Sequence, residues 1–459
     1  MAAPKKIPEK EYSNLSTQLV HALFEARAKG LPLQVLYKAQ LHIADALGIA
    51  VAARSTHIAV TISEALKQAT AQSGLCQVFG GGSATALTAA FLNSSLIHIL
   101  DYDDIHDEGR LHPGTVILPA VLAAADLVKA KDATIIEAMA LGSELMCKLG
   151  VLCAPKGNGP GADWFLTQLF GYLGAAFAAS FVLGLSEKQV ISAIGLAYMQ
   201  AAGGKEAGFG TGSNARAIYP AFAAQGGVQA ALLAQAGMVG PSSALDGDAG
   251  FFKIYLGAPL TAAKRKQLLN FSTWHCLNVE IKPWPSCRLS HPYVAVGLAA
   301  RSLCETLPDV KIRVSVNSSA GRLCSPLAER LKPATLQDAK YSIPFMTAFA
   351  LVHGEPSLTS LSDRVLKDRA VLAMAGRIEI DQSLVDKPGH PMTVLTLMKG
   401  SKKIQSFAFK ASDLSMSEKM IETKFKDCLT YAGAENIYKK VWSALIKGRI
   451  RQALKSCNV

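Results

Sequence analysis

One stretch of the chain concentrates side chains that could do acid–base or metal chemistry. Residues 100–119 read LDYDDIHDEGRLHPGTVILP and include four aspartates, a glutamate, an arginine and two histidines. Apolar sequence lies on both sides, AALTAAFLNSSLIHI before it and TVILPAVLAAADLV after it. Charged groups are costly to bury unless they are paired or used. A polar island between two hydrophobic helices therefore predicts an active site.

Three chemistries fit this island. It could be an acidic surface turn, or a metal site, because carboxylates and imidazoles bind Mg, Mn or Zn. The spacing of its ligands matches no particular metal geometry. The third chemistry is metal-free acid–base catalysis, with His112 as the proton carrier and Asp101 orienting the ring or supplying a second carboxylate. We favour the third, and we expect Asp104 to take part in substrate binding.

A second candidate segment interrupts two predicted helices with five glycines. Residues 201–219 read AAGGKEAGFGTGSNARAIY and carry Lys205, Arg216 and Tyr219. Backbone N–H groups in such a loop, together with a cation, can hold carboxylates. A plain interhelical loop is the alternative.

A third candidate segment, residues 281–291, reads IKPWPSCRLSH and is stiffened by two prolines. It places the potential cations Lys282, Arg288 and His291 within a short distance along the chain. A rigid basic segment suits anion binding. A proline-braced linker with solvated charges is the alternative.

The elements that must position these residues are mostly helices. Leu- and Ala-rich apolar stretches favour helix over sheet, and the Ser186–Gln189 spacing predicts a capping box at the start of one of them. Near residue 270 the character changes, because three later segments alternate in polarity and are β-branched, as strands are. We therefore predict a mainly α protein, with a large all-helical domain (1–270 and 405–459) and a smaller inserted α+β lid domain (271–404). The predicted helices include 13–30, 33–55, 58–72, 84–100, 113–130, 133–152, 220–238, 338–353 and 360–374, and the predicted strands are 311–317, 375–382 and 392–398.

Composition excludes several classes of function. The 459 residues exceed what one core usually serves, which favours two domains. The net charge of +12 is scattered, which argues against nucleic acid and is compatible with a small anionic substrate. Nine cysteines without a CxxC motif argue for a reducing compartment and against disulfides or structural zinc. The N-terminal residues lack a secretory pattern, and two long uncharged runs (164–186 and 217–245) fit buried helices, so we expect no membrane partner and a cytoplasmic protein, with mitochondria as the alternative.

Several segments together resemble the MmgE/PrpD family, and the resemblance covers nearly the whole chain. They read HILDYDDIHDEGRLHPGTVILPAVLAAAD, GLSEKQVISAIGLAYMQAAG, YPAFAAQGGVQAALLAQAGMVGP, IKPWPSCRLSH and DAKYSIPF. This family includes 2-methylcitrate dehydratases, cis-aconitate decarboxylases and iminodisuccinate epimerases. The resemblance implies a helical domain with an α+β lid domain, a homodimer, and small di- or tricarboxylate substrates bound between the domains. It also implies catalysis without a metal or cofactor.

The resemblance carries over residue by residue. Asp101 and His112 match the DFDD…HP segment of the family, and Lys282 matches the lysine of its K-P-x-P segment. Four positions depart from the family pattern: Ile105 replaces a hydroxyl residue, Phe165 and Tyr219 replace histidines, and Arg216 replaces a lysine.

We therefore predict a cofactor-independent lyase that transfers a proton at a carbon next to a carboxylate, as a dehydratase or decarboxylase. His112 would be the general base or acid, and cations would stabilise the enolate-like state. An epimerase or isomerase of the same fold, and a non-catalytic carboxylate-binding protein, are the alternatives, with a metal hydrolase as a third. Asp101 would orient His112, Lys282, Arg288, Arg216 and Lys205 would bind carboxylates, and Tyr219 or His291 would be the second proton carrier.

Overall fold

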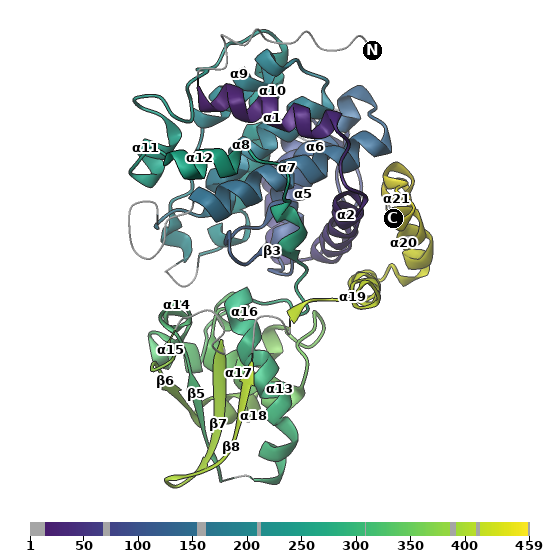
Figure 1. Cartoon of the computed structure of the whole chain (residues 1–459). Coiled ribbons are helices and arrows are strands. Elements are labelled where there is room, and N and C mark those ends of the chain that lie inside the picture. The colour runs from purple at the N-terminus through teal and green to yellow at the C-terminus, as the bar shows by residue number, and fades with distance from the viewer. Residues whose placement is uncertain are drawn as a thin grey trace. The chain divides into compact units, whose positions relative to one another are not determined.

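The computed structural model describes residues 14–67, 74–153, 162–208, 213–307, 309–385, 392–409 and 414–457. The chain divides into two compact units, Met1–Ile281 with Ser417–Val459, and Lys282–Met416. The predicted boundaries, at 270/271 and 404/405, lie a little earlier in the chain. Residues 209–212 of the glycine-rich segment 201–219 lie outside the described residues. The mainly α fold with a small α+β region is confirmed (Figure 1).

The first unit is built from helices around α8 (Leu166–Val182), in which every residue is buried. Helix α10 (Tyr219–Gln235) packs closely against α8, because Gly227 has no side chain. A Cβ atom there would lie 2.3 Å from the Cβ of Ala175. Helices α5 (Ala86–His98) and α6 (Pro113–Val128), which flank the polar island, pack against α10 as well. The other helices of this unit are α1 (Leu15–Ala28), α2 (Leu33–Ala53), α3 (His57–Ala65), α7 (Asp132–Cys153), α9 (Glu187–Tyr198), α11 (Phe251–Leu256) and α12 (Ala262–Leu268), followed by α19 (Glu418–Tyr431), α20 (Tyr438–Ile446) and α21 (Ile450–Ser456).

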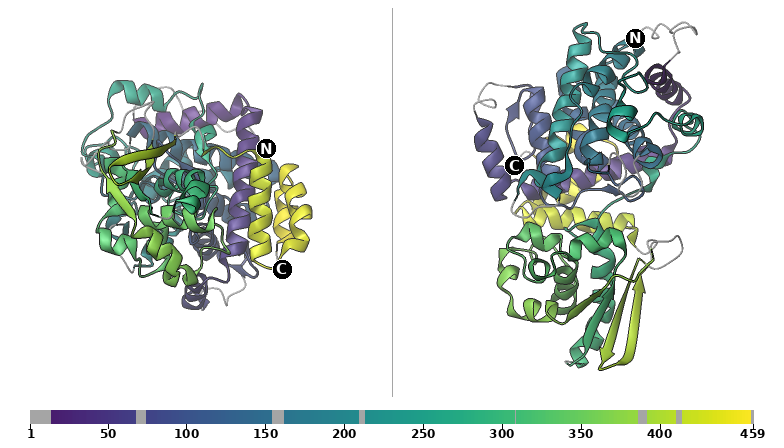
Figure 2. Two further views of the ribbon diagram at one scale, coloured as in Figure 1. Left: turned by 90° about the horizontal axis from the view of Figure 1, so that it is seen from below. Right: turned by 90° about the vertical axis from the view of Figure 1, so that its left-hand side faces the viewer.

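The C-terminal helices pack back onto the beginning of the chain. Helix α19 packs along α2, and Figure 2 shows the yellow C-terminal helices beside the purple α2. Among the described residues, α2 is the one helix long and apolar enough to cross a membrane, and 78% of its apolar window is buried inside the protein. That burial is typical of a core helix.

The second unit contains a four-stranded sheet in the order β6-β5-β7-β8. Strand β5 (Lys311–Ser315) runs parallel to β6 (Ile378–Asp381) and antiparallel to β7 (Thr393–Lys399), which pairs with β8 (Lys402–Phe409). Alternation buries Ile312 and Val314 on one face of β5. Helices α13 (His291–Thr306) and α17 (Ile343–His353) pack together, and α13 contacts β7 and β8. The remaining helices of this unit are α14 (Ser318–Gly321), α15 (Leu327–Leu331), α16 (Leu336–Lys340) and α18 (Arg369–Ala375).

Candidate active site

The polar island folds as a loop between α5 and α6 that is held in an unusual backbone path. Asp101 and Arg110 both have φ of 54°, in the left-handed region that side chains other than glycine rarely adopt. A short strand, β3 (Ile105–His106), pairs with β4 (Val279–Glu280) and fixes the middle of the loop. Backbone strain of this kind persists only where the surroundings enforce it, and it is common at functional sites.

His106, inside this loop, has a structural role. Its Nδ1 accepts a hydrogen bond from the backbone N–H of Gly109 at 3.0 Å. Its Nε2 therefore carries the proton and donates to the carbonyl oxygen of His275 at 3.1 Å. Burial lowers the pKa of His106, which keeps the ring neutral.

A buried lysine from the C-terminal part of the chain supports the start of the loop. Lys424 Nζ donates to the carbonyl oxygen of Tyr102 at 2.8 Å and lies 3.8 Å from the centre of its ring. The same ammonium group forms an ion pair with Asp45 Oδ1 at 2.7 Å. Burial raises the pKa of Asp45 to about 6, although Lys424 acts in the opposite direction. Helices α19 and α2 thus together anchor the loop.

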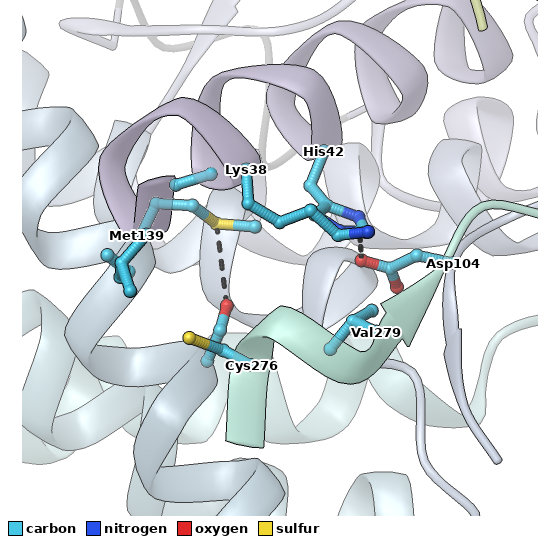
Figure 3. Close-up of a pocket in the computed structure, with 10 residues that line it drawn as sticks. Lys38, His42, Asp104, Met139, Cys276 and Val279 are labelled. Carbon is cyan, nitrogen blue, oxygen red and sulfur yellow. Dashed lines mark hydrogen bonds and ion pairs between the residues drawn. The ribbon is translucent and has the colours of Figure 1, made fainter. Parts of the chain in front are cut away.

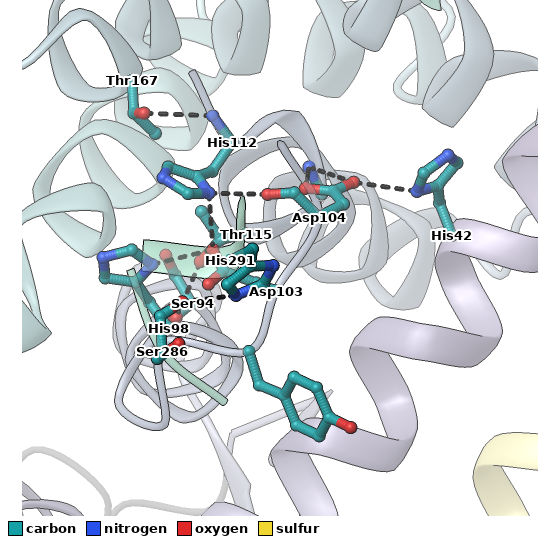
Figure 4. A network of polar contacts seen from close by, with 12 residues as sticks. His42, Ser94, His98, Asp103, Asp104, His112, Thr115, Thr167, Ser286 and His291 are labelled. Carbon is teal, nitrogen blue, oxygen red and sulfur yellow. Dashed lines mark hydrogen bonds and ion pairs between the residues drawn. The ribbon is translucent and has the colours of Figure 1, made fainter. Parts of the chain in front are cut away.

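Two histidines share one carboxylate at the heart of the site (Figure 4). Asp103 Oδ2 lies 2.8 Å from His98 Nδ1 and 3.4 Å from His112 Nδ1. The rings of His98 and His112 meet edge to face, with centroids 5.3 Å apart. Asp103 is only 1% exposed, so its carboxylate acts on both rings in a medium of low dielectric constant.

The tautomer of His112 follows from a second contact. Its Nδ1 lies 2.6 Å from the backbone carbonyl oxygen of Asp104. A carbonyl oxygen can only accept, so Nδ1 carries a proton and donates it. In the neutral ring the lone pair is therefore on Nε2, which is the atom that can take or give a proton during a reaction.

The carboxylate of Asp104 fixes the backbone that carries His112. It accepts the N–H of Gly114 at 3.0 and 3.1 Å. On its other side Asp104 Oδ2 lies 3.0 Å from His42 Nδ1, in a small pocket drawn in Figure 3. Gly114 must lack a side chain, because a Cβ atom there would lie 2.6 Å from Asp104 Oδ2. The backbone carbonyl oxygen of Asp104 therefore holds the His112 ring, and the carboxylate of Asp104 holds the turn that follows His112.

Two further residues connect this cluster to an open hollow. The backbone N–H of His112 donates to Thr167 Oγ1 at 3.1 Å. Tyr219 is hydrogen-bonded to Thr167, and burial raises the pKa of its phenol well above the ordinary value. Its ring meets His98 edge to face at 5.1 Å and stacks on Phe165 at 4.1 Å. At neutral pH Tyr219 is therefore a protonated donor at the edge of the histidine cluster.

The hollow is partly open to solvent, and the space in it that protein atoms do not fill, open solvent included, is about 350 Å³. Two of the residues that line it are cations, Arg110 and Lys205. Two cations with a hydroxyl group and a phenol suit a small carboxylate. Its lining comprises Arg110, Ala162, Trp164, Phe165, Leu166, Thr167, Lys205 and Tyr219.

Most of the predicted site residues of the first unit meet in this region. His112, Asp104, Lys205 and Tyr219 take part as described, and the Arg216 guanidinium lies 6.0 Å from the centre of the Phe165 ring, above its face. Asp101 is buried, and its charge raises the pKa of Tyr219. The orienting role assigned to Asp101 stays a prediction, while Asp103 and the Asp104 carbonyl contact the His112 ring directly.

Three predicted site residues belong to the second unit. His291 is buried there, with Nε2 3.2 Å from the carbonyl oxygen of Ser286 and its ring 5.4 Å from that of Trp284. Lys282 is buried, and Arg288 begins a short 3-10 helix. Their expected parts in carboxylate binding and proton transfer stay predictions.

Sequence reasoning missed several residues of the site. His98 and Asp103 are five positions apart, on α5 and the loop after it, and that spacing could have suggested a pair. His42 reads in the sequence as an ordinary core histidine. Arg110 lies inside the polar island, but nothing in the sequence shows that it lines the hollow, and no local pattern marks Lys424.

A metal centre has no counterpart in the described part of the chain, where no three His, Cys, Asp or Glu side chains are arranged to hold an ion. All nine cysteines are reduced and buried.

Comparison with known proteins gives two family matches that together span most of the chain. The model of the MmgE/PrpD N-terminal domain matches residues 17–262, and that of the C-terminal domain matches residues 284–443. A cis-aconitate decarboxylase-like protein, oryM, from Aspergillus oryzae is 27% identical over 82% of this chain and 82% of its own length. A cis-aconitate decarboxylase from Aspergillus terreus is 27% identical over 76% of this chain and 74% of its own. The human cis-aconitate decarboxylase is 32% identical over 36% of this chain and 34% of its own.

Proposed function

The chain belongs to the MmgE/PrpD family, and from this premise we propose that it is a lyase that decarboxylates a small polycarboxylate. The names of the curated relatives favour decarboxylation over loss of water. One observation carries the proposal, namely that His98 and His112 share the buried carboxylate of Asp103 beside a hollow lined by two cations.

In the proposed reaction, the bond between a substrate carbon and its carboxylate breaks and CO₂ leaves. The electron pair stays on the substrate and is delocalised toward a second carboxylate, which Arg110 and Lys205 stabilise electrostatically. The protonated His112 ring then gives its Nε2 proton to the carbon, forming a C–H bond, and regains a proton from water. Asp103 supports this step because it stabilises the charged ring beforehand.

Tyr219 is the second proton donor in the proposal. Its raised pKa keeps the phenol protonated at neutral pH, so it can donate a hydrogen bond to a substrate carboxylate without carrying charge itself. If the proton were instead removed and returned on the opposite face, the same groups would make an epimerase, which is the second candidate from the sequence. The relatives' names favour the lyase.

A substrate panel with proton-exchange measurements tests the proposal. The purified protein is incubated with cis-aconitate and related polycarboxylates, and CO₂ release and exchange of carbon-bound protons with D₂O are measured together. A decarboxylase releases CO₂, whereas an epimerase exchanges protons without releasing it. If no member of the panel gives CO₂ release or proton exchange, the enzymatic role is contradicted, and the carboxylate-binding alternative is left.

His112→Gln tests the assigned proton carrier. We expect turnover to fall by about a hundredfold or more, the usual scale for loss of a general acid or base. His57→Gln is the matched control, because His57 is exposed at the start of α3 and has no part in the site. Equal turnover of both variants would remove His112 from the mechanism.

Two further expectations come from the family and belong to the same proposal. The enzyme should work without an added metal or cofactor, so turnover should survive prolonged dialysis against a chelator. It should also form a homodimer without a nucleic-acid or membrane partner, and light scattering of the purified protein measures its mass in solution. A cytoplasmic location, with mitochondria as the alternative, completes the proposal and can be checked by cell fractionation.

A further inference from the structure

Helix α2 contacts the loop between α5 and α6 at two neighbouring points. His42 and Asp45 are three positions apart, so their side chains lie on the same face of this helix. Asp45 pairs with the α19 lysine that binds the carbonyl oxygen of Tyr102. His42 Nδ1 lies 3.0 Å from Asp104 Oδ2. The two contacts thus fall on either side of Asp103, the carboxylate at the heart of the site.

The groups around His42 fix the position of one of its ring protons. Both carboxylate oxygens of Asp104 accept the N–H of Gly114. A carboxylate can only accept, so a bare Nδ1 at 3.0 Å would set two lone pairs against each other. Nδ1 therefore carries a proton and attracts Asp104. The N–H and this oxygen are poorly aligned for a hydrogen bond, so the attraction is mainly electrostatic.

The second ring nitrogen of His42 can be served by water. The side chain is 5% exposed, and its Nε2 has no hydrogen-bond partner among the described residues. His42 lines the small pocket of Figure 3 together with Lys38, Ser143 and Asp104. This pocket has room for about one water molecule, which can bond Nε2. An imidazole can thus attract the carboxylate with one nitrogen and bind water with the other.

We propose that His42 is a positioning residue, which holds the Asp104 carboxylate and, through Asp104, the ring of His112. This role rests on the proposed function, because it takes His112 as the proton carrier. Without His42, Asp104 keeps the N–H of Gly114 but loses the attraction on its opposite side. Tyr102 is still held through α19, so the loop loosens without unfolding. The loss of activity should therefore be smaller than in His112→Gln.

His42→Leu and His42→Asn are a matched pair of variants, because leucine and asparagine have nearly the same shape. Only asparagine carries an N–H group, close to the place of Nδ1, that can attract Asp104. We expect kcat of His42→Leu to fall about tenfold, and that of His42→Asn to stay within about threefold of the original. KM should change less than about twofold in both, because Arg110 and Lys205 still line the hollow. Equal losses of kcat in the two variants, or no loss in His42→Leu, would overturn the proposal.

NMR of the histidine rings measures the position of His112 without turnover. The chain has ten histidines, and ¹⁵N-histidine labelling resolves their rings, with the signals lost in His112→Gln assigned to His112. We expect these signals to shift in His42→Leu and to stay close to the original in His42→Asn. Leu47→Ala is the control for lost stability, because Leu47 is buried on α2 and, five positions on, lies on a different side of the helix. A shift of the same size in Leu47→Ala would contradict a specific role of His42.

The positioning role and the chemistry fail separately. If the His112 signals shift as expected but the original protein turns over no polycarboxylate, the lyase is refuted and the hold of His42 on the loop stands. If the original protein decarboxylates a polycarboxylate while His42→Leu keeps its kcat and its His112 signals, the lyase stands and the role of His42 is refuted.

Discussion

Gly114→Ala is the sharpest test of how the loop holds His112. The added Cβ atom would lie 2.6 Å from Asp104 Oδ2, 3.0 Å from its Cγ and 3.1 Å from Oδ1. Real Cβ contacts are not this short, so the carboxylate must move away. Its movement breaks the hydrogen bonds from the Gly114 N–H and shifts the residue whose carbonyl oxygen binds His112 Nδ1.

The expected size of the effect follows from these contacts. Overpacking a filled site costs about 1–3 kcal/mol. Loss of a hydrogen bond to a charged group costs about 1.5–3 kcal/mol. Together the two contributions predict that the free energy of unfolding falls by about 2.5–6 kcal/mol. Because a displacement of about 1 Å at a catalytic group can cost a hundredfold in rate, kcat should fall by about that factor even where the variant is folded.

Denaturant unfolding and steady-state kinetics measure the two effects separately. Gly142→Ala is the matched control, since its Cβ atom would lie 2.8 Å from Ile117 Cγ2 and 2.9 Å from Ala178 Cβ, in the helical core. We expect that variant to be destabilised and to keep its kcat. A Gly114→Ala protein with the stability and kcat of the original would refute the proposed role of Asp104 in positioning His112. Equal losses of kcat in Gly114→Ala and Gly142→Ala would show that kcat falls because the protein is less stable, and not because His112 is displaced.

Three further predictions concern the groups around the loop. Asp103→Asn keeps the shape of the side chain but removes the charge shared by His98 and His112, so kcat should fall by about a hundredfold or more with an unchanged circular dichroism spectrum. Lys424→Met leaves Asp45 buried without its cation and should lower the free energy of unfolding, measured by urea titration, by about 3–5 kcal/mol. The double variant with Asp45→Asn should recover part of the lost stability. No recovery would contradict the ion pair. The pKa of Asp45 rises from 3.8 to about 6 on folding, so the native state binds the Asp45 proton more tightly than the unfolded state does. The contribution of this proton to stability is therefore complete below about pH 4 and is lost as the pH rises through about 6. Asp45→Asn should flatten that part of the curve of stability against pH.

Short sequence patterns predicted the elements that depend on residues close together in the chain. The Ser186–Gln189 capping box is present at the start of α9, and the alternating residues of β5 are buried as expected. Strand β8 was missed, and its second part, 405–409, was assigned to the helical domain, because KKIQSFAF exposes residues on both faces and shows no alternation of burial. One predicted helix, 338–353, is broken into α16 and α17 at Tyr341, with a proline at the start of the second.

The candidate site was predictable only where its residues are neighbours in the chain. The polar island drew attention to His112 because many charged groups lie together there. The residues that hold this loop in place come from distant parts of the chain, since Lys424 and Tyr102 are 322 positions apart. Such a contact depends on how whole helices pack, which hydrophobic periodicity does not specify. The same holds for the pair of His42 and Asp104, which joins α2 to the loop.

The ammonium group under Tyr102 also sets an order of events during protein synthesis. The ribosome makes the polar loop early, then the whole of the 282–416 unit, and only afterwards the helix that carries Lys424. Until that helix emerges and packs on α2, Asp45 has no cation and the Tyr102 carbonyl lacks this donor. A nascent chain that stops after the second unit would therefore contain every proposed reacting group and still lack the Lys424 contacts that support the polar loop.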